Sequence, residues 1–370
     1  MLKLVLGASG SGKTTLLYAR IRARAEAGKR SILLVPEQFT SSTEARIYRE
    51  LGDALSGMVE SYSFTSLAEH ILAVEGGAAV QTPTDAGRAV LVRRALEELQ
   101  DNVHYYYRHR RSAAFCQMAA ETIDELKSAG LSGQQLQELA RDCGSESAKL
   151  GELALIFQGY ESLLAGTGMD PADRLELAAD RLEAALARNE LPDFLREREV
   201  FIDEFDTFNA PKKRLMGAML AALPAVTVAL CEDGAPMQPG DSELFSGAKQ
   251  VAAQLRQLAR KNGAQVSAPE LLRRDLRHKD APGLAALTEL LETGSCTPPE
   301  SAPELRLFAA ASREEEARCA AAAIRRLMRQ GVRCGKIAVV CRDINLYRAA
   351  VRYEFRMAEI PLYCDEPTTP

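Results

Sequence analysis

A glycine-rich segment close to the first residue holds the clearest chemistry in this sequence. Residues 7–14 read GASGSGKT and match the pattern G-x-x-x-x-G-K-[ST], which binds nucleotide phosphates. Glycine lets backbone N–H groups close around a phosphate, and the start of a following helix adds partial positive charge. We expect ATP to bind at Gly7, Ala8, Ser9, Gly10, Ser11, Gly12, Lys13, Thr14 and Thr15.

Two positions of this segment and an acidic pair have distinct expected roles. Lys13 should reach the β- and γ-phosphates, and Thr14 should ligate Mg²⁺. Asp203 and Glu204 follow the apolar run 199–202, where a buried strand would end. We expect Asp203 to hold Mg²⁺ through water and Glu204 to polarise the attacking water as a general base. The alternative is a carboxylate pair that only caps a turn.

These residues need a sheet that brings them to one edge. Short apolar runs predict buried parallel strands, and the helical patterns between them predict crossover helices, so the sequence indicates an α/β fold. The expected strands are residues 2–6, 31–35, 59–63, 199–202 and 225–231, with helices at 14–27 and 65–74.

Residues 84–164 have a different character, because apolar residues recur there at helical spacing and strand signals are absent. We expect a helical insertion there and a further helix at 171–187. Ser132 and Gln135 fit a helix capping box. Their segment, LSGQQ, also resembles the signature of ABC ATPases, but in that family the signature lies close before the acidic strand, and here it does not.

The last part of the sequence predicts a second α/β unit. Three prolines between Thr297 and Pro303 indicate a linker. After it we expect a strand at 305–309, a helix capped by Ser312 and a strand at 336–340. The sequence ends at TTP, directly after LYCDEP and with no closing helix, so we expect a fragment that is cut within this unit.

Composition excludes several classes of protein. The 51 acidic and 46 basic residues give a net charge of −5, which does not favour a general nucleic-acid-binding protein. We find no apolar run of 18 residues and no signal-peptide layout, so we expect no membrane span and a cytoplasmic location. The eight cysteines form no C-x-x-C pair and do not cluster with the four histidines, which favours free thiols over a metal site.

Several segments together resemble a known family. LVLGASGSGKTTLL at the start, ILLVPEQFT at 32–40, SYSFTSLAEHIL at 61–72 and FIDEFDTF at 201–208 are similar to the B subunit of AddAB-type ATP-dependent helicase/deoxyribonucleases. Residues 305–327 and 336–343 resemble the start of that family's second motor domain. The general plan is that of superfamily 1 helicases. The family's proteins are much longer than 370 residues.

The resemblance implies a fold and a domain plan. It implies a P-loop NTPase with a RecA-like parallel sheet, an inserted helical subdomain and the beginning of a second RecA-like domain. The expected domains are residues 1–82 with 167–302, the insertion 83–166, and the truncated second domain 303–370. The family's nuclease domain and its iron–sulfur cluster would lie outside this fragment.

The resemblance also implies a function and partners. It implies the ATP-binding, motor-like portion of a subunit that processes DNA double-strand ends for recombinational repair, with DNA and the A subunit as partners. Asp206 stands where true helicases of the superfamily have glutamine, so ATP binding is implied more firmly than helicase activity. For this fragment we expect ATP binding with feeble hydrolysis.

Further site residues are expected from the resemblance. Arg342 would reach the γ-phosphate from the second domain, or it is a surface arginine at a strand end. Ser63, Phe64 and Thr65 lie where the resembling helicases contact single-stranded DNA. Residues 105–111 mix tyrosines with basic side chains, and we favour an ordinary helix there over a DNA-stacking platform. Residues 273–279 are expected to form a solvated helix face.

Two other functions stay open at this point. The first is a non-motor scaffold that scans DNA and binds a partner, with a largely structural nucleotide site. The second is a free-standing P-loop enzyme with a small substrate. The long gap between Lys13 and Asp203 requires an inserted domain, and small P-loop kinases are usually compact.

Overall fold

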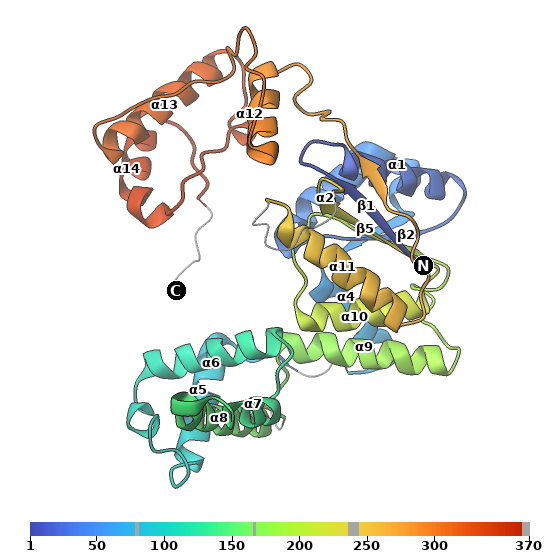
Figure 1. Cartoon of the computed structure of the whole chain (residues 1–370), viewed down its shortest axis with the longest axis vertical. Helices are drawn as coiled ribbons and strands as arrows, with labels where there is room; N and C mark the ends of the chain where they lie inside the picture. Colours follow the sequence, from blue (N-terminus) through green and yellow to red (C-terminus); the bar gives the residue numbers. More distant parts are fainter. Residues whose placement is uncertain (78–80, 166–167, 236–243, 365–370) are drawn as a thin grey trace. The chain divides into compact units, whose positions relative to one another are not determined.

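The chain forms two compact units, Met1–Asp280 and Ala281–Pro370. The structure is a computed structural model, and it describes residues 1–77, 81–165, 168–235 and 244–364 (Figure 1). None of the helices in the described ranges is both long and apolar enough to cross a membrane.

A six-stranded, all-parallel sheet lies at the centre of the first unit, so the fold is α/β as predicted. The strand order is β3-β2-β4-β5-β1-β6, and Leu2 to Gly7 of β1 pair in register with Val226 to Cys231 of β5. The strands are β1 (Leu2–Gly7), β2 (Ser31–Leu34), β3 (Val59–Tyr62), β4 (Glu199–Ile202), β5 (Ala225–Cys231) and β6 (Glu270–Leu272). Five of the six were predicted; β6 was not.

Helices cover both faces of this sheet, because successive strand side chains point to opposite faces. Val5 and Leu33 pack with residues of α1 (Lys13–Glu26) and α2 (Thr40–Leu51). Leu4 and Leu34 pack on the other face, against four helices (Figure 1). These are α4 (Phe64–Glu75), α9 (Pro171–Ala187), α10 (Ala210–Ala222) and α11 (Ser246–Lys261). Two short elements, η1 (Glu37–Phe39) and α3 (Asp53–Ser56), flank α2.

The helices predicted between α4 and α9 are present, and they have their own hydrophobic core. They are α5 (Asp85–Glu98), η2 (Tyr107–His109), α6 (Ala113–Ser128), α7 (Gly133–Ala140), η3 (Gly144–Glu146) and α8 (Ser147–Ala165). The predicted capping box is confirmed, since Ser132 and Gln135 each accept from the other's backbone N–H at the start of α7.

A buried polar cluster joins α6 to the start of α9. Lys127 Nζ donates to Asp170 Oδ2 at 2.9 Å and to Asp173 Oδ2 at 2.7 Å, and the Tyr160 hydroxyl donates to Asp170 Oδ1 at 2.8 Å. Lys127 and Asp170 are both buried. Since α9 belongs to the core beneath the sheet, this cluster connects the helices α5–α8 to that core.

The second unit contains α12 (Pro282–Thr293), α13 (Arg313–Arg329), η4 (Cys334–Lys336) and α14 (Ile344–Met357). Ser312 caps α13 as predicted, because its Oγ accepts from the Glu315 N–H. The strands predicted at 305–309 and 336–340 are wrong: neither segment forms a ladder. Their apolar side chains suggested burial on both faces of a sheet, yet Leu307 is 99% exposed and Val340 is 89% exposed.

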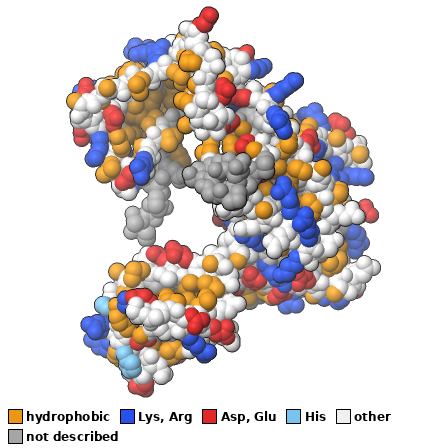
Figure 2. Space-filling model, viewed as in Figure 1, with side chains coloured by type: hydrophobic (Ala, Val, Ile, Leu, Met, Phe, Trp, Pro, Cys, Tyr) orange, Lys and Arg blue, Asp and Glu red, His pale blue; other side chains and the backbone are white. Residues whose placement is uncertain are grey.

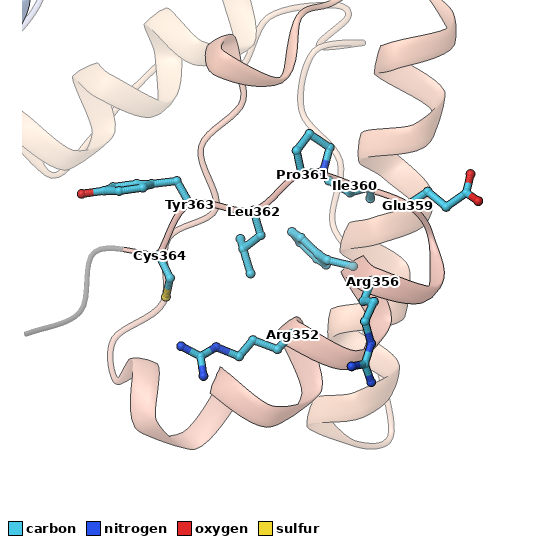
Figure 3. A pocket seen from close by; sticks show the side chains of 9 residues that line it. Arg352, Arg356, Glu359, Ile360, Pro361, Leu362, Tyr363 and Cys364 are labelled. Carbon is cyan, nitrogen blue, oxygen red and sulfur yellow. The ribbon is translucent and has the colours of Figure 1, made fainter. Parts of the chain in front are cut away.

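Hydrophobic side chains therefore lie on the surface of the second unit, as Figure 2 shows. A hollow of about 670 Å³ opens beside the end of α14. Leu362 projects into it and the guanidinium groups of Arg352 and Arg356 lie along it (Figure 3). Among the described residues of this unit, neither extended segment pairs with a neighbouring strand, so no sheet forms there.

Candidate nucleotide-binding site

The glycine loop, residues Gly7 to Gly12, connects the end of β1 to the start of α1. Gly10 has φ +80° and Gly12 has φ +92°, which side chains other than glycine rarely adopt. A Cβ on Gly7 would lie 2.4 Å from Ser11 Oγ and 2.7 Å from the Leu272 carbonyl oxygen. The loop thus holds its tight shape because these positions lack side chains.

Lys13 is the first residue of α1, and its side chain turns back over the loop. Its Nζ donates to the Gly7 carbonyl oxygen at 2.7 Å and to the Ala8 carbonyl oxygen at 2.8 Å. The ammonium therefore lies where backbone N–H groups and a helix N-terminus also favour negative charge. Thr14 and Thr15 follow in the first turn of α1.

Asp203 and Glu204 follow β4 at the same edge of the sheet. Asp203 is 5% exposed, and burial raises its pKa, while the Thr14 hydroxyl, the Glu204 N–H and the charges of Arg46 and Lys13 oppose that rise. The pKa of Glu204 is raised by burial and by the Asp203 charge. The structure thus brings Lys13, Thr14 and the two acids together, as the sequence predicts, because parallel strands present their carboxyl ends at one edge.

Glu204 has an unusual backbone. Its φ is +65°, in the left-handed region that disfavours side chains with a Cβ. Its N–H donates to Asp203 Oδ1 at 3.0 Å, and the side chain is exposed. Backbone strain of this kind is found at functional positions, where the surrounding structure enforces it.

The segment Arg273 to Lys279 corrects the sequence interpretation. It is not a helix: it is an irregular segment that follows β6 and lies against the glycine loop. Leu276 N donates to the Gly10 carbonyl oxygen at 3.0 Å, and Arg277 Nη1 donates to Ser9 Oγ at 3.2 Å. Burial would raise the pKa of Asp275, but hydrogen bonds from the His278 side chain and from the backbone N–H groups of His278 and Arg277 outweigh it, so the pKa is lowered.

Three buried polar atoms near this edge lack a hydrogen-bond partner among the described residues. They are Ser11 Oγ in the glycine loop, Arg46 Nε on α2 and Glu232 Oε2 after β5. The Glu232 N–H donates to the Gly7 carbonyl oxygen at 3.1 Å, so this acid adjoins the loop. Buried polar groups are normally paired, and unpaired ones gather at sites that take a ligand.

The residues present fit Mg²⁺ and a nucleotide triphosphate. The glycine loop is a cradle that any Cβ would fill, and it contains an unpaired buried hydroxyl. No group of three His, Cys, Asp or Glu side chains suited to a metal occurs in the described ranges. Mg²⁺ does not need one, because it binds through one or two protein oxygens together with phosphates and water. Thr14 and Asp203 are the residues that would hold it.

The residues predicted to contact DNA lie beside the acid pair. Ser63 is buried and caps α4, Phe64 is 2% exposed, and Thr65 is half-buried. They line a hollow of about 390 Å³ together with Glu204 and other residues that follow β2 and β4. Their role in DNA contact stays a prediction.

An aromatic cluster connects this hollow to the acid pair. The Phe64 ring packs edge-on against Phe205, with ring centroids 5.3 Å apart, and Phe205 stacks on Phe208 at 5.4 Å. Lys212 Nζ lies 5.5 Å from the Phe205 ring centroid. The start of α4 and the loop after β4 are therefore packed as one piece.

Arg342 and residues 105–111 were also singled out by the sequence. Arg342 is an exposed residue of the second unit, and its role stays a prediction. Residues 105–111 form turns around the short 3-10 helix η2 and not the longer helix expected there. Glu152 accepts from the N–H groups of His104, Tyr105 and Tyr106 and so fixes the backbone before η2. Tyr106 stacks on Phe115 with ring centroids 5.5 Å apart, which supports a packing role for that ring.

Comparison with known proteins identifies the family. The family model described as "ADDB, N-terminal" matches residues 4–288. The chain belongs to the AddB family. This agrees with the resemblance carried by the glycine loop and by the segment around Asp203.

Curated relatives of this AddB-family chain are named as the B subunit of an ATP-dependent helicase/deoxyribonuclease. The Moorella thermoacetica protein is 33% identical over 98% of the chain, and the Desulforudis audaxviator protein is 34% identical over 98%. The Symbiobacterium thermophilum protein is 31% identical over the full chain. In each case the chain spans 32% of the relative's own length.

Sequence reasoning missed two residues at the candidate nucleotide-binding site of this chain. Arg277 was assigned to a solvated helix face, and Arg46 was not considered at all. Neither follows a recognisable motif, since each reaches the site only through the packing of its element. The strand before Arg277, Glu270–Leu272, has only three residues, two of them apolar, and is too short to stand out in the sequence.

Proposed function

We propose that the glycine loop binds Mg²⁺–ATP and that the chain is the ATP-binding, motor-like part of a helicase–nuclease subunit. One observation carries this proposal. Lys13 and Thr14 lie with Asp203 and Glu204 at one edge of a parallel sheet, although the two pairs are far apart in the sequence. This combination of a phosphate-binding loop, a metal-binding acid and a water-activating acid suits phosphoryl transfer to water.

Each residue has a role in this proposal. The loop N–H groups and Lys13 bind the phosphates, Thr14 and Asp203 hold Mg²⁺, and Glu204 accepts the proton of the attacking water. Mg²⁺ neutralises charge on the phosphate oxygens when bound. Arg277, which contacts Ser9, adds a cation beside the loop. Arg342 would supply a further cation from the second unit, in the way that arginines stabilise developing charge in phosphoryl transfer.

The wider role rests on the relatives' names. Proteins named as the B subunit of an ATP-dependent helicase/deoxyribonuclease support a place in a two-subunit enzyme that processes DNA double-strand ends for repair. DNA and an A subunit are the partners in this proposal. The domain plan of a RecA-like unit with an inserted helical subdomain, and the start of a second such unit, belongs to the same proposal.

A scaffold with a structural nucleotide site is the second candidate. Asp206, at a position where motor proteins of this kind have glutamine, favours it, and so does the closed contact of Arg277 with the loop. Steady-state ATP hydrolysis, measured with and without single-stranded DNA, distinguishes the two. Turnover that DNA stimulates and that Glu204→Gln abolishes supports the motor. Tight nucleotide binding with no turnover under either condition supports the scaffold.

A further inference from the structure

Arg46 lies on α2, on the face that packs toward α1. Its neighbours on that face, Thr43 and Ile47, are buried. Its guanidinium carbon lies 4.8 Å from the ring centroid of Tyr18, which belongs to α1 and is 6% exposed. The ring thus holds the guanidinium by one flat face, which leaves the N–H groups around its edge to point elsewhere.

The charge of Arg46 acts on the acid pair. It lowers the pKa of Asp203 and of Glu204 against the rise that burial causes. Tyr18 does not neutralise the positive charge of Arg46. Burial raises the pKa of the Tyr18 phenol to about 12, so this side chain is uncharged at neutral pH. Arg46 therefore contributes a full positive charge next to the two carboxylates.

The hydrogen-bonding capacity of Arg46 is unused among the described residues. Nε is buried without a partner, and no hydrogen bond or ion pair joins the guanidinium to another described side chain. An arginine carries five N–H donors in a planar fork that matches phosphate oxygens, and leaving a buried donor unpaired is costly. A ligand that brings oxygen atoms to this place would satisfy it.

Sheet order indicates which part of a nucleotide that would be. β4 lies between β2, which α2 follows, and β5, beyond which lies β1. The carboxyl end of β4, with Asp203 and Glu204, therefore lies between the end of β2, from which the chain leads to α2, and the end of β5, which adjoins the strand of the glycine loop. The charge of Arg46 acts on both Asp203 and Glu204, so a phosphate held beside these acids would be the part of a nucleotide that Arg46 could bind.

We propose that Arg46 binds the terminal phosphate of a nucleoside triphosphate, and that it makes this site select triphosphates over diphosphates. The inference rests on the proposed function, since it requires the glycine loop to bind phosphates. It adds a specificity-determining residue that neither the loop pattern nor the acid pair identifies. Arg49 offers a matched control, because it is an exposed arginine on the same helix.

Nucleotide selectivity is the test. Displacement of a fluorescent ADP by unlabelled ADP, or by a non-hydrolysable ATP analogue, gives the two dissociation constants in the presence of Mg²⁺. Arg46→Ala should bind the triphosphate analogue about tenfold more weakly and ADP as well as before, since a charged hydrogen bond is lost for one ligand alone. Arg49→Ala should leave both constants unchanged, and thermal unfolding checks that each variant is folded.

The outcomes separate the two proposals. Equal weakening of ADP and triphosphate binding in Arg46→Ala, or no weakening of either, would overturn the role of Arg46 and leave the nucleotide site in place. Failure of the unmodified chain to bind either nucleotide would overturn the proposed function and this inference with it. Arg46→Lys, which keeps the charge without the planar fork, should recover part of the selectivity.

Discussion

Arg277 donates a hydrogen bond to Ser9 across 3.2 Å, although 268 residues separate them in the chain. A second bond, from Leu276 N to the Gly10 carbonyl oxygen, runs beside it. The glycine loop is thus fixed from outside by the segment after β6, as well as by its own backbone. Substitutions in the loop should therefore disturb this contact and phosphate binding together.

Gly10→Ala should reveal that coupling. Gly10 has φ +80°, and an added Cβ would lie 2.8 Å from Asp275 Oδ1 and 2.9 Å from Arg277 Cβ. Left-handed strain and the clash together should cost about 2–4 kcal/mol of unfolding free energy, and nucleotide affinity should fall. Urea denaturation and nucleotide titration measure the two effects.

Gly28→Ala is the control for Gly10→Ala. Gly28 also has a positive φ of +71°, but an added Cβ would meet no atom within 4 Å. It should lose only the strain energy of about 1–2 kcal/mol and bind nucleotide normally. Normal nucleotide affinity in Gly10→Ala would contradict the coupling between the loop and residues 275–277.

Lys13→Ala should abolish the stabilisation that Mg²⁺–ATP gives. A ligand that binds only the native state adds about 2.7 kcal/mol at a hundredfold excess over its dissociation constant. Lys13 directly follows the glycine loop and places its positive charge over it, since its Nζ lies 2.7 Å from the Gly7 carbonyl oxygen. Thermal unfolding with and without nucleotide is the measurement. Lys29→Ala, an exposed lysine beyond the end of α1, should keep the full shift.

Two substitutions of Glu204 separate its chemistry from its backbone strain. Glu204→Gln should keep ATP binding and lose about 10²–10⁴ in turnover, because an amide cannot accept the proton of water. Glu204→Gly should lose the same turnover, but its unfolding free energy should be about 1 kcal/mol higher than that of the unmodified chain. Glycine adopts φ +65° without strain, so the folded state becomes more stable.

Glu197→Gly is the matched control for this position. Glu197 has φ +60° and is exposed in the loop before β4. It should gain similar stability and leave turnover unchanged. If Glu204→Gln hydrolysed ATP at the unmodified rate, the carboxylate would only cap a turn.

The sheet of the first unit could be predicted because its strands are continuous apolar runs between turn residues. β4 and β5 have the predicted bounds. Both faces of these strands are buried, so their sequences are continuous apolar runs and not an alternation of apolar and polar residues. The pattern failed at 305–309 and 336–340, where equally apolar residues lie exposed. An apolar run indicates that the side chains of a segment can be buried. A strand also needs a neighbouring strand that pairs with its backbone N–H and C=O groups, and the run does not indicate whether one is present.

The site could be predicted in part for a related reason. Lys13, Asp203 and Glu204 carry local patterns, because each adjoins the end of a strand. Arg277 and Arg46 carry none: the first depends on a three-residue edge strand, and the second on how α2 packs against Tyr18. Side chains that reach a site across tertiary packing leave no signal at fixed sequence spacing.

Asp203→Asn should show what the buried carboxylate costs the fold. Burial is the largest influence on Asp203 and raises its pKa, so the folded chain holds this proton to a higher pH than the unfolded chain, where the pKa is about 3.9. Between those two pKa values the folded state binds more protons, so the unfolding free energy falls as pH rises. The cost grows as pH rises through the raised pKa of Asp203 and is complete above it. Asn, of the same size but uncharged, should therefore make the ligand-free protein more stable at pH 7, by an amount that shrinks as pH falls toward 4.

Metal binding should respond in the opposite direction, because Mg²⁺ requires the carboxylate. The unmodified chain should bind Mg²⁺–ATP more weakly as pH falls through the raised pKa of Asp203, and ATP binding to Asp203→Asn should depend less on Mg²⁺ than binding to the unmodified chain. Urea denaturation at pH 7 and pH 4, with nucleotide titration at both, measures these effects. Asp206→Asn, which changes an exposed carboxylate of the same loop, should alter neither. An Asp203→Asn chain that is less stable than the unmodified chain at pH 7 would mean that Thr14, Arg46 and Lys13 already compensate the buried charge, and that Asp203 is a structural residue.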